Sequence, residues 1–137
     1  MDLITWYLAQ LDEDEAVARA ATDGHWYAKE ARYAPKYGEG VNADVCVEGA
    51  TDGYTVVVGE PEGFGACALE DAVHIARHDP AHVLADIAAK WAIVEIHGRE
   101  HWCPNHLEWD EGPCQTLRLL ASALSDRPGY DPAWAPS

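Results

Sequence analysis

The feature that most constrains this fold is a cluster of metal-ligating side chains in one short segment, residues 97–114. Cys103 and His106 are separated by two residues, and seven further residues separate His106 from Cys114. A two-residue spacing lets both side chains of a tight turn reach one ion, and Pro104–Asn105 suits such a turn. Because helices are predicted on both sides of this segment, a tetrahedral zinc ion here would hold two helix ends together.

The fourth ligand is ambiguous from the sequence. His97 closes the preceding predicted helix, whereas His101 is only two residues from Cys103, which is sterically tight. We therefore expect His97, with His101 as the alternative. Four protein ligands would close the zinc shell, which indicates a structural Zn²⁺ ion without an open position for water. The predicted ligands are His97, Cys103, His106 and Cys114.

Other interpretations of the same segment stay open. The residues can be metal-free thiols and surface histidines, or part of an iron–sulfur site, although two of the four cysteines lie far away in the sequence. The stretch from His97 to His101 also matches H-x-x-E-H, a pattern of zinc hydrolases. That interpretation requires a helix that continues through Gly98, where the sequence predicts a helix end.

A metal ion would supplement a thin apolar core. Leu, Ile, Val and Phe together make up only 26 of the 137 residues, and the formal net charge is −15. Such a combination borders on the composition of disordered chains. Six Trp and six Tyr residues oppose this tendency, because each can bury a large apolar area. We expect a single domain over residues 1–137, stabilised by aromatic packing and one zinc ion.

The hydrophobic periodicity predicts an α+β fold. We expect an N-terminal helix, a small antiparallel sheet of about three strands, two further main helices joined by the zinc knuckle, and an extended, packed C-terminal tail. The predicted elements are a helix over residues 2–21, strands over 25–29, 44–48 and 54–58, a short helix over 69–78, a helix over 80–97, a helix from about 113, and a tail over 126–137.

Local signals support these boundaries. Asp79 before Pro80 is typical of a helix N-cap followed by the first helical residue, and Gly98 stands where that helix should end. Val45 and Val47 alternate with polar neighbours, which predicts a half-buried strand. We expect the tail to pack its aromatic side chains onto the body of the protein.

A second set of histidines, His74, His78 and His82, is spaced at four-residue intervals. On one unbroken helix these side chains could bind a metal or act as acid–base groups. The predicted helix break at Asp79 should separate His82 from the others. We therefore expect His74 or His78 only to cap or hydrogen-bond the following helix. Cys46 and Cys67 are expected to be free thiols.

Charge and hydropathy exclude several functions. The excess of acidic residues opposes binding to a phosphate backbone, so no direct nucleic acid binding is expected. No run of about 18 apolar residues exists that could span a membrane. The N-terminus lacks the basic and apolar regions of a signal peptide, so we expect a cytoplasmic protein. The oligomeric state does not follow from the sequence.

Three segments carry a family resemblance: His74–Ala81, Cys114–Ala121 and Tyr130–Trp134. Together they resemble small uncharacterised proteins from actinobacterial and actinophage genomes that share a domain of unknown function. Members typically have C-x2-C where this chain has Cys103-x2-His106, a change that retains a zinc ligand. The resemblance implies a bacterial or phage-infected cytoplasm, and it implies no activity.

No G-x-S-x-G, Rossmann or P-loop pattern is present. We therefore expect a non-enzymatic, zinc-stabilised interaction or regulatory protein whose acidic surface binds a protein partner with a basic surface. A phage-encoded protein that acts on a host protein would fit this expectation. The alternatives are a DNA-mimicking inhibitor of a nucleic-acid enzyme and a small metal-dependent hydrolase.

Overall fold

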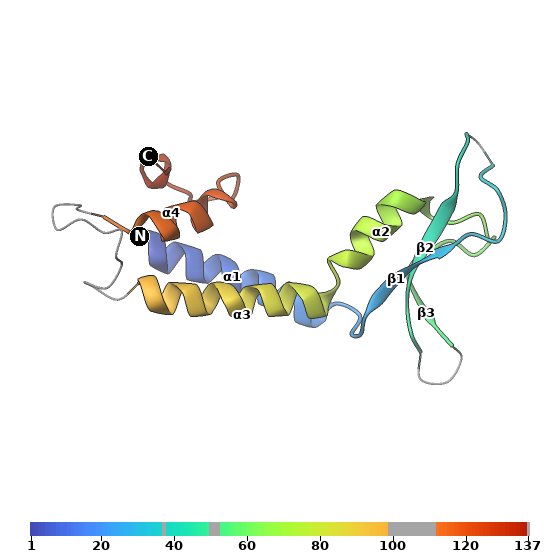
Figure 1. The fold of residues 1–137 in the computed structure, drawn as a ribbon, viewed down its shortest axis with the longest axis horizontal. Helices are drawn as coiled ribbons and strands as arrows, with labels where there is room; N and C mark the ends of the chain where they lie inside the picture. The colour runs from blue at the N-terminus through green and yellow to red at the C-terminus, as the bar shows by residue number, and fades with distance from the viewer. Residues whose placement is uncertain (37, 50–52, 99–111, 137) are drawn as a thin grey trace. The chain divides into compact units, whose positions relative to one another are not determined.

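The computed structural model describes residues 1–36, 38–49, 53–98 and 112–136, and it confirms the α+β class (Figure 1). Helices, strands and one 3₁₀ turn occur in these residues. In chain order they are α1 (Leu3–Ala20), β1 (Trp26–Glu30), β2 (Asn42–Val47), β3 (Thr55–Val58), β4 (Cys67–Ala68), α2 (Leu69–Arg77), α3 (Pro80–His97), α4 (Gln115–Ser122) and η1 (Pro132–Trp134). Among the described helices, none is long and apolar enough to cross a membrane.

The chain divides into two compact units, each of which has its own packing. One unit comprises residues 17–84 and contains the sheet with α2. The other comprises residues 1–16 and 85–137 and contains most of α1 and α3 together with α4. That residues 1–137 fold as a single domain stays a prediction.

In the unit of residues 17–84, β2 is the central strand of an antiparallel sheet. β1 pairs with β2 along one edge, from Trp26 opposite Val47 to Glu30 opposite Ala43. β3 and β4 both pair with β2 along its other edge. The prediction of about three strands therefore omitted β4, because two residues are too few to show the alternation that identifies a strand.

The helix α2 packs on one face of this sheet, beside which it lies in Figure 1. Ala72 and Ala76, one helical turn apart, contact Ala43 and Val45 of β2 in the core. Small alanine side chains allow the helix and the sheet to approach closely. The register of β2 with β3 is irregular between Val45 and Cys46, and three successive residues of β2 are buried: Val45, Cys46 and Val47. The predicted half-buried strand is thus buried on both faces at this point.

Asp79 connects the start of α3 with the start of β1. Its Oδ1 accepts a hydrogen bond from the backbone N–H of His82 at 2.8 Å, which is the predicted N-cap. Its Oδ2 accepts from the backbone N–H of Trp26 at 3.2 Å and lies 3.2 Å from Nδ1 of His25. Burial by itself would raise the pKa of Asp79. The hydrogen bonds from His82, Trp26 and His25 outweigh it and hold the pKa below its usual value.

We predict that the ionisation of Asp79 makes the free energy of unfolding vary with pH in the acidic range. Because its pKa is lowered by folding, its ionised form stabilises the native state above the unfolded pKa of about 3.9. This stabilisation is lost as the pH falls below that value through the folded pKa. Asp79→Asn should flatten the stability profile between about pH 5 and pH 2, as measured by urea unfolding. Equal slopes in the wild type and in the variant would contradict this role.

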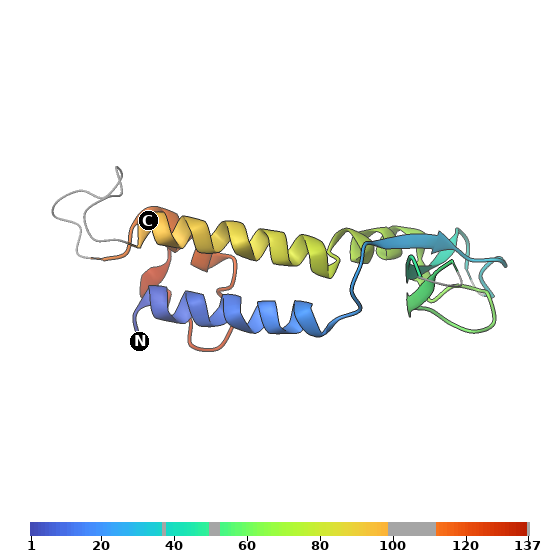
Figure 2. The same ribbon diagram turned by 90° about the horizontal axis from the view of Figure 1, so that it is seen from below.

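In the unit of residues 1–16 and 85–137, α1 and α3 run side by side in opposite directions (Figures 1 and 2). The core of this unit includes the buried side chains Leu3, Tyr7, Leu11 and Leu117. Burial, followed by the nearby charges of Asp86 and Asp14, raises the pKa of Tyr7 to about 12. Tyr7 therefore remains neutral in the core at physiological pH.

The C-terminal tail packs onto α1 through aromatic rings. The ring centroid of Trp6 lies 5.6 Å from that of Tyr130 and 5.4 Å from that of Trp134. The indole N–H of Trp6 donates to the carbonyl of Pro128 at 3.0 Å. This confirms the predicted packing of the tail. The tail is not extended throughout, because Pro132–Trp134 forms a 3₁₀ turn capped by Asp131.

Candidate metal centre

Two of the four predicted zinc ligands meet at the facing ends of two helices. His97 is the last residue of α3, and Cys114 is the N-cap residue of α4. The Sγ atom of Cys114 lies 3.7 Å from Nδ1 of His97. Cys103, His106 and the alternative ligand His101 lie outside the described residues. The preferred histidine of the sequence analysis is thus the one that lies beside Cys114.

The local sequence explains both positions. The backbone N–H of Gly98 closes the last turn of α3 onto the carbonyl of Val94 at 2.7 Å, so α3 ends at the predicted residue. A side chain on residue 98 would collide with that carbonyl, because a Cβ atom would stand 2.7 Å from it. The glycine therefore lets the chain leave the helix directly after His97.

Cys114 lies directly before the first turn of α4, and this position favours a thiolate. Its side chain is buried, and its backbone is extended directly before α4. The N–H groups at the start of a helix carry partial positive charge, which stabilises a nearby thiolate. A thiolate is the form of cysteine that binds zinc. The position at the start of α4 therefore fits the negative charge of a metal-bound thiolate.

The distance between the two side chains is the spacing expected of ligands that share a zinc ion. Zn–S bonds of about 2.3 Å and Zn–N bonds of about 2.0–2.1 Å at a tetrahedral angle place S and N about 3.6 Å apart. The observed separation is 3.7 Å. A thiol–imidazole hydrogen bond is also compatible with this distance. Within the described ranges, no group of three or more ligating side chains could hold a metal ion.

Arg118 supports this end of α4 in a way that the sequence analysis missed. Its Nε donates to the carbonyl of Pro113, next to Cys114, at 3.1 Å. Its Nη1 donates to the carbonyls of Ala133 at 3.2 Å and Ala135 at 3.3 Å. Arg118 thus connects the segment before Cys114 to the C-terminal tail. No periodicity or spacing in the sequence indicates these partners, because all three are backbone carbonyls.

The second histidine set differs from the expectation in two respects. The helix breaks before α3 as predicted, but the ring of His82 still lies beside that of His78. The ring centroids of His74 and His78 lie 4.6 Å apart, and those of His78 and His82 lie 5.8 Å apart. His78 hydrogen-bonds the carbonyl of His74 in its own helix, and Asp79 rather than a histidine caps the following helix.

The remaining predictions concern cysteines and the hydrolase motif. Cys46 and Cys67 are free thiols, as expected, and burial raises the pKa of both. The helix α3 ends at His97, so the described part of the H-x-x-E-H stretch does not form the continuous helix on which a zinc hydrolase would depend.

Comparison with known proteins identifies a family but no activity. No curated protein and no solved structure matches the chain. One family description, a family of unknown function, matches residues 1–136. Because this match covers nearly the whole sequence, the chain belongs to the family of unknown function DUF6221.

Proposed function

We propose that this chain is a non-enzymatic interaction or regulatory protein, that a structural zinc ion stabilises it, and that its acidic surface binds a protein with a basic surface. The proposed zinc ion is supported by the 3.7 Å separation between Sγ of Cys114 and Nδ1 of His97. The two residues belong to the ends of α3 and α4, so a shared ion would fasten two helices at the same place.

The composition of the predicted ligand set supports a structural role. Together with Cys103 and His106, the pair His97 and Cys114 would complete four protein ligands. Such a closed shell leaves no position at which zinc could activate water, whereas catalytic zinc sites keep one position open. This argues for an ion that stabilises the fold and against a small metal-dependent hydrolase.

The charge of the chain supports a basic protein partner. The formal net charge is −15, and the acidic run over residues 12–15 lies on α1. Asp12 and Glu13 are exposed there, whereas Asp14 lies 2.8 Å from Arg127 in an ion pair. Exposed negative charge accelerates encounters with basic surfaces and repels the phosphate backbone of nucleic acids. A protein is therefore the favoured partner.

The cellular setting that we propose is the bacterial or phage-infected cytoplasm. It rests on the resemblance to actinobacterial and actinophage proteins and on the cysteines. Cys46 and Cys67 are free thiols, and zinc binding by cysteine likewise needs reduced thiols. The DNA-mimicking alternative requires a spaced stripe of carboxylates. In the described residues, exposed acidic side chains occur on α1, β1, α2 and α3.

A binding measurement tests the proposed interaction. Purified protein is used to capture partners from a bacterial lysate, and the affinity of an isolated partner is then measured at increasing salt. We expect binding that weakens steeply above about 0.15 M salt, because exposed charges are screened there. The double variant Asp12→Lys with Glu13→Lys should bind at least about tenfold more weakly.

The matched control keeps both charges at these two positions. The variant Asp12→Glu with Glu13→Asp should bind like the wild type, because only the side-chain lengths change. A partner whose affinity is independent of salt and of the charge reversal would contradict the electrostatic part of the proposal. Competition of that partner's binding by DNA would instead support the DNA-mimicking alternative.

A further inference from the structure

We propose that His74 and His78 form a binding site for a divalent late first-row transition-metal cation, with His82 as a neighbouring third imidazole. These residues belong to the unit of residues 17–84. The inference does not rest on the zinc ion proposed at His97 and Cys114, because it uses different side chains and different contacts.

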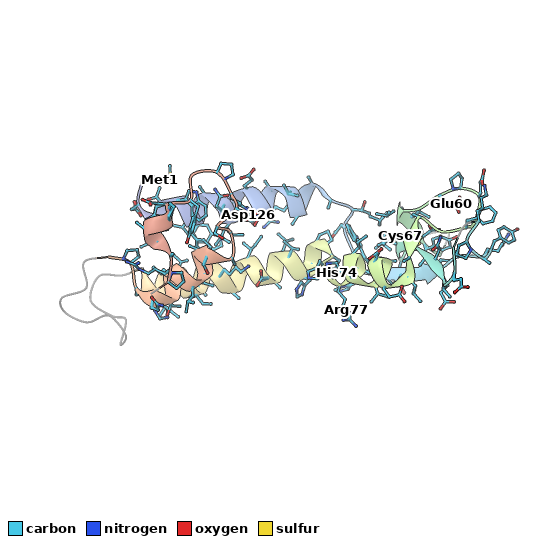
Figure 3. The ribbon with its side chains drawn as sticks, turned by 90° about the horizontal axis from the view of Figure 1, so that it is seen from above. Met1, Glu60, Cys67, His74, Arg77 and Asp126 are labelled. Carbon is cyan, nitrogen blue, oxygen red and sulfur yellow. The ribbon has the colours of Figure 1, made fainter. Side chains whose placement is uncertain are left out.

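The rings of the two histidines lie next to each other. His74 lies in the last turn of α2 and His78 is the C-cap residue of that helix, both are exposed, and their ring centroids are 4.6 Å apart. Figure 3 labels His74 on this helix. Two histidines at positions i and i+4 on one helix face are the arrangement by which helices present two zinc ligands.

The hydrogen bond of His78 leaves Nε2 of its ring able to bind a metal. Nδ1 of His78 lies 2.8 Å from the carbonyl oxygen of His74. A carbonyl oxygen only accepts hydrogen bonds, so Nδ1 carries the proton, and in the neutral ring the lone pair is on Nε2. Metal-binding histidines usually donate their other ring N–H to a carbonyl or carboxylate, which orients the ring. His78 already makes this contact.

His82 follows the junction between α2 and α3 and places a third imidazole beside His78. Its ring is perpendicular to that of His78 with the centroids 5.8 Å apart, and its backbone N–H is bound by Asp79. In the described residues no three ligating side chains have the geometry to hold a metal. The site therefore offers two protein nitrogens, water completes the coordination, and a rotation of the His82 side chain would add a third nitrogen.

The chemistry of the donors selects the ion. Imidazole suits Zn²⁺, Cu²⁺ and Ni²⁺, whereas Mg²⁺ and Ca²⁺ prefer oxygen ligands. Glu70 and Asp71 in the first turn of α2 add negative charge near the pair, which offsets the charge of Arg77. The predicted ligand is therefore a cation from the late first row.

Titration with Ni²⁺ tests this site in the full chain after one equivalent of Zn²⁺ has been added to fill the site proposed at His97 and Cys114. Ni²⁺ is chosen because it suits imidazole and does not oxidise the free thiols. We expect one equivalent to bind, with an affinity that His74→Gln and His78→Gln each reduce on the order of tenfold or more, because each leaves a single nitrogen. His82→Gln should have a smaller effect. His25→Gln is the control, since His25 is exposed and does not belong to the set of His74, His78 and His82.

The melting temperature with and without Ni²⁺ shows whether a variant has lost metal binding or has lost its fold. Because the two rings are held side by side only in the folded protein, Ni²⁺ should raise the melting temperature of the wild type and of His25→Gln but not of His78→Gln. The proposal is overturned if no Ni²⁺ binds, or if His74→Gln and His78→Gln bind it like the wild type.

Discussion

Removal of zinc is expected to unfold the part of the protein that contains α3, α4 and the tail, and Cys114→Ser should have the same effect without any chelator. Structural zinc sites contribute about 10–16 kcal/mol of binding free energy that is available only in the folded state. Domains of this size are stable by only about 5–15 kcal/mol. With few large aliphatic side chains in the chain, the loss of the ion should leave little residual stability.

The measurement combines metal analysis with thermal unfolding. The purified protein should contain one zinc per chain, and a chelator should lower its melting temperature strongly. Cys114→Ser and His97→Gln should both lose zinc. Cys67→Ser is the matched control, because Cys67 is a free thiol on β4, and this variant should keep its zinc and its melting temperature. A metal-free wild type with an unchanged melting curve would identify the 3.7 Å contact as a thiol–imidazole hydrogen bond.

Trp6→Ala is expected to be the most destabilising substitution away from the metal centre. The side chain of Trp6 is only 3% exposed, and it contacts the rings of Tyr130 and Trp134. Removing a buried Trp side chain costs about 3–5 kcal/mol, since it leaves a cavity as well as losing apolar burial. Trp6→Phe should cost less, because it keeps an aromatic ring and loses mainly the hydrogen bond to Pro128.

Urea unfolding followed by circular dichroism measures both variants. Trp91→Ala is the control for the loss of an indole, because Trp91 lies on α3 and is 38% exposed. Hydrogen exchange at the backbone of residues 128–135 should accelerate in Trp6→Ala, since the tail loses its contact with α1. If Trp6→Ala and Trp91→Ala were equally stable, the aromatic cluster would not hold the tail in place.

The helices could be predicted well because their ends are encoded by neighbouring residues. Asp79 followed by Pro80 marked the start of α3, and Gly98 marked its end. β4 could not be predicted, because its two residues acquire strand character only through pairing with Asn42 and Ala43 of β2. The burial of Cys46 was also missed, since it follows from an irregular register with β3 rather than from alternation.

In the candidate metal site too, the sequence predicted the local features and missed the contacts between distant residues. The spacing of cysteines and histidines predicted which residues could share an ion, and it favoured His97 over His101 by its place at the end of a helix. The contact of His97 with Cys114 joins residues 17 positions apart, so it depends on how α3 and α4 pack. The predicted separation of His82 from His78 was wrong, because the chain turns at Asp79 in a way that keeps the two rings adjacent.

The sequence by itself determined where the helices begin and end and which side chains have metal-binding chemistry, because caps, stops and donor atoms are properties of a few consecutive residues. Only the tertiary structure decided which distant groups meet. Asp79 binds Trp26 as well as capping α3, Arg118 binds the carbonyls of the tail, and Trp6 packs against Tyr130. Each of these contacts joins segments far apart in the chain, and no local pattern of residues specifies such a pairing.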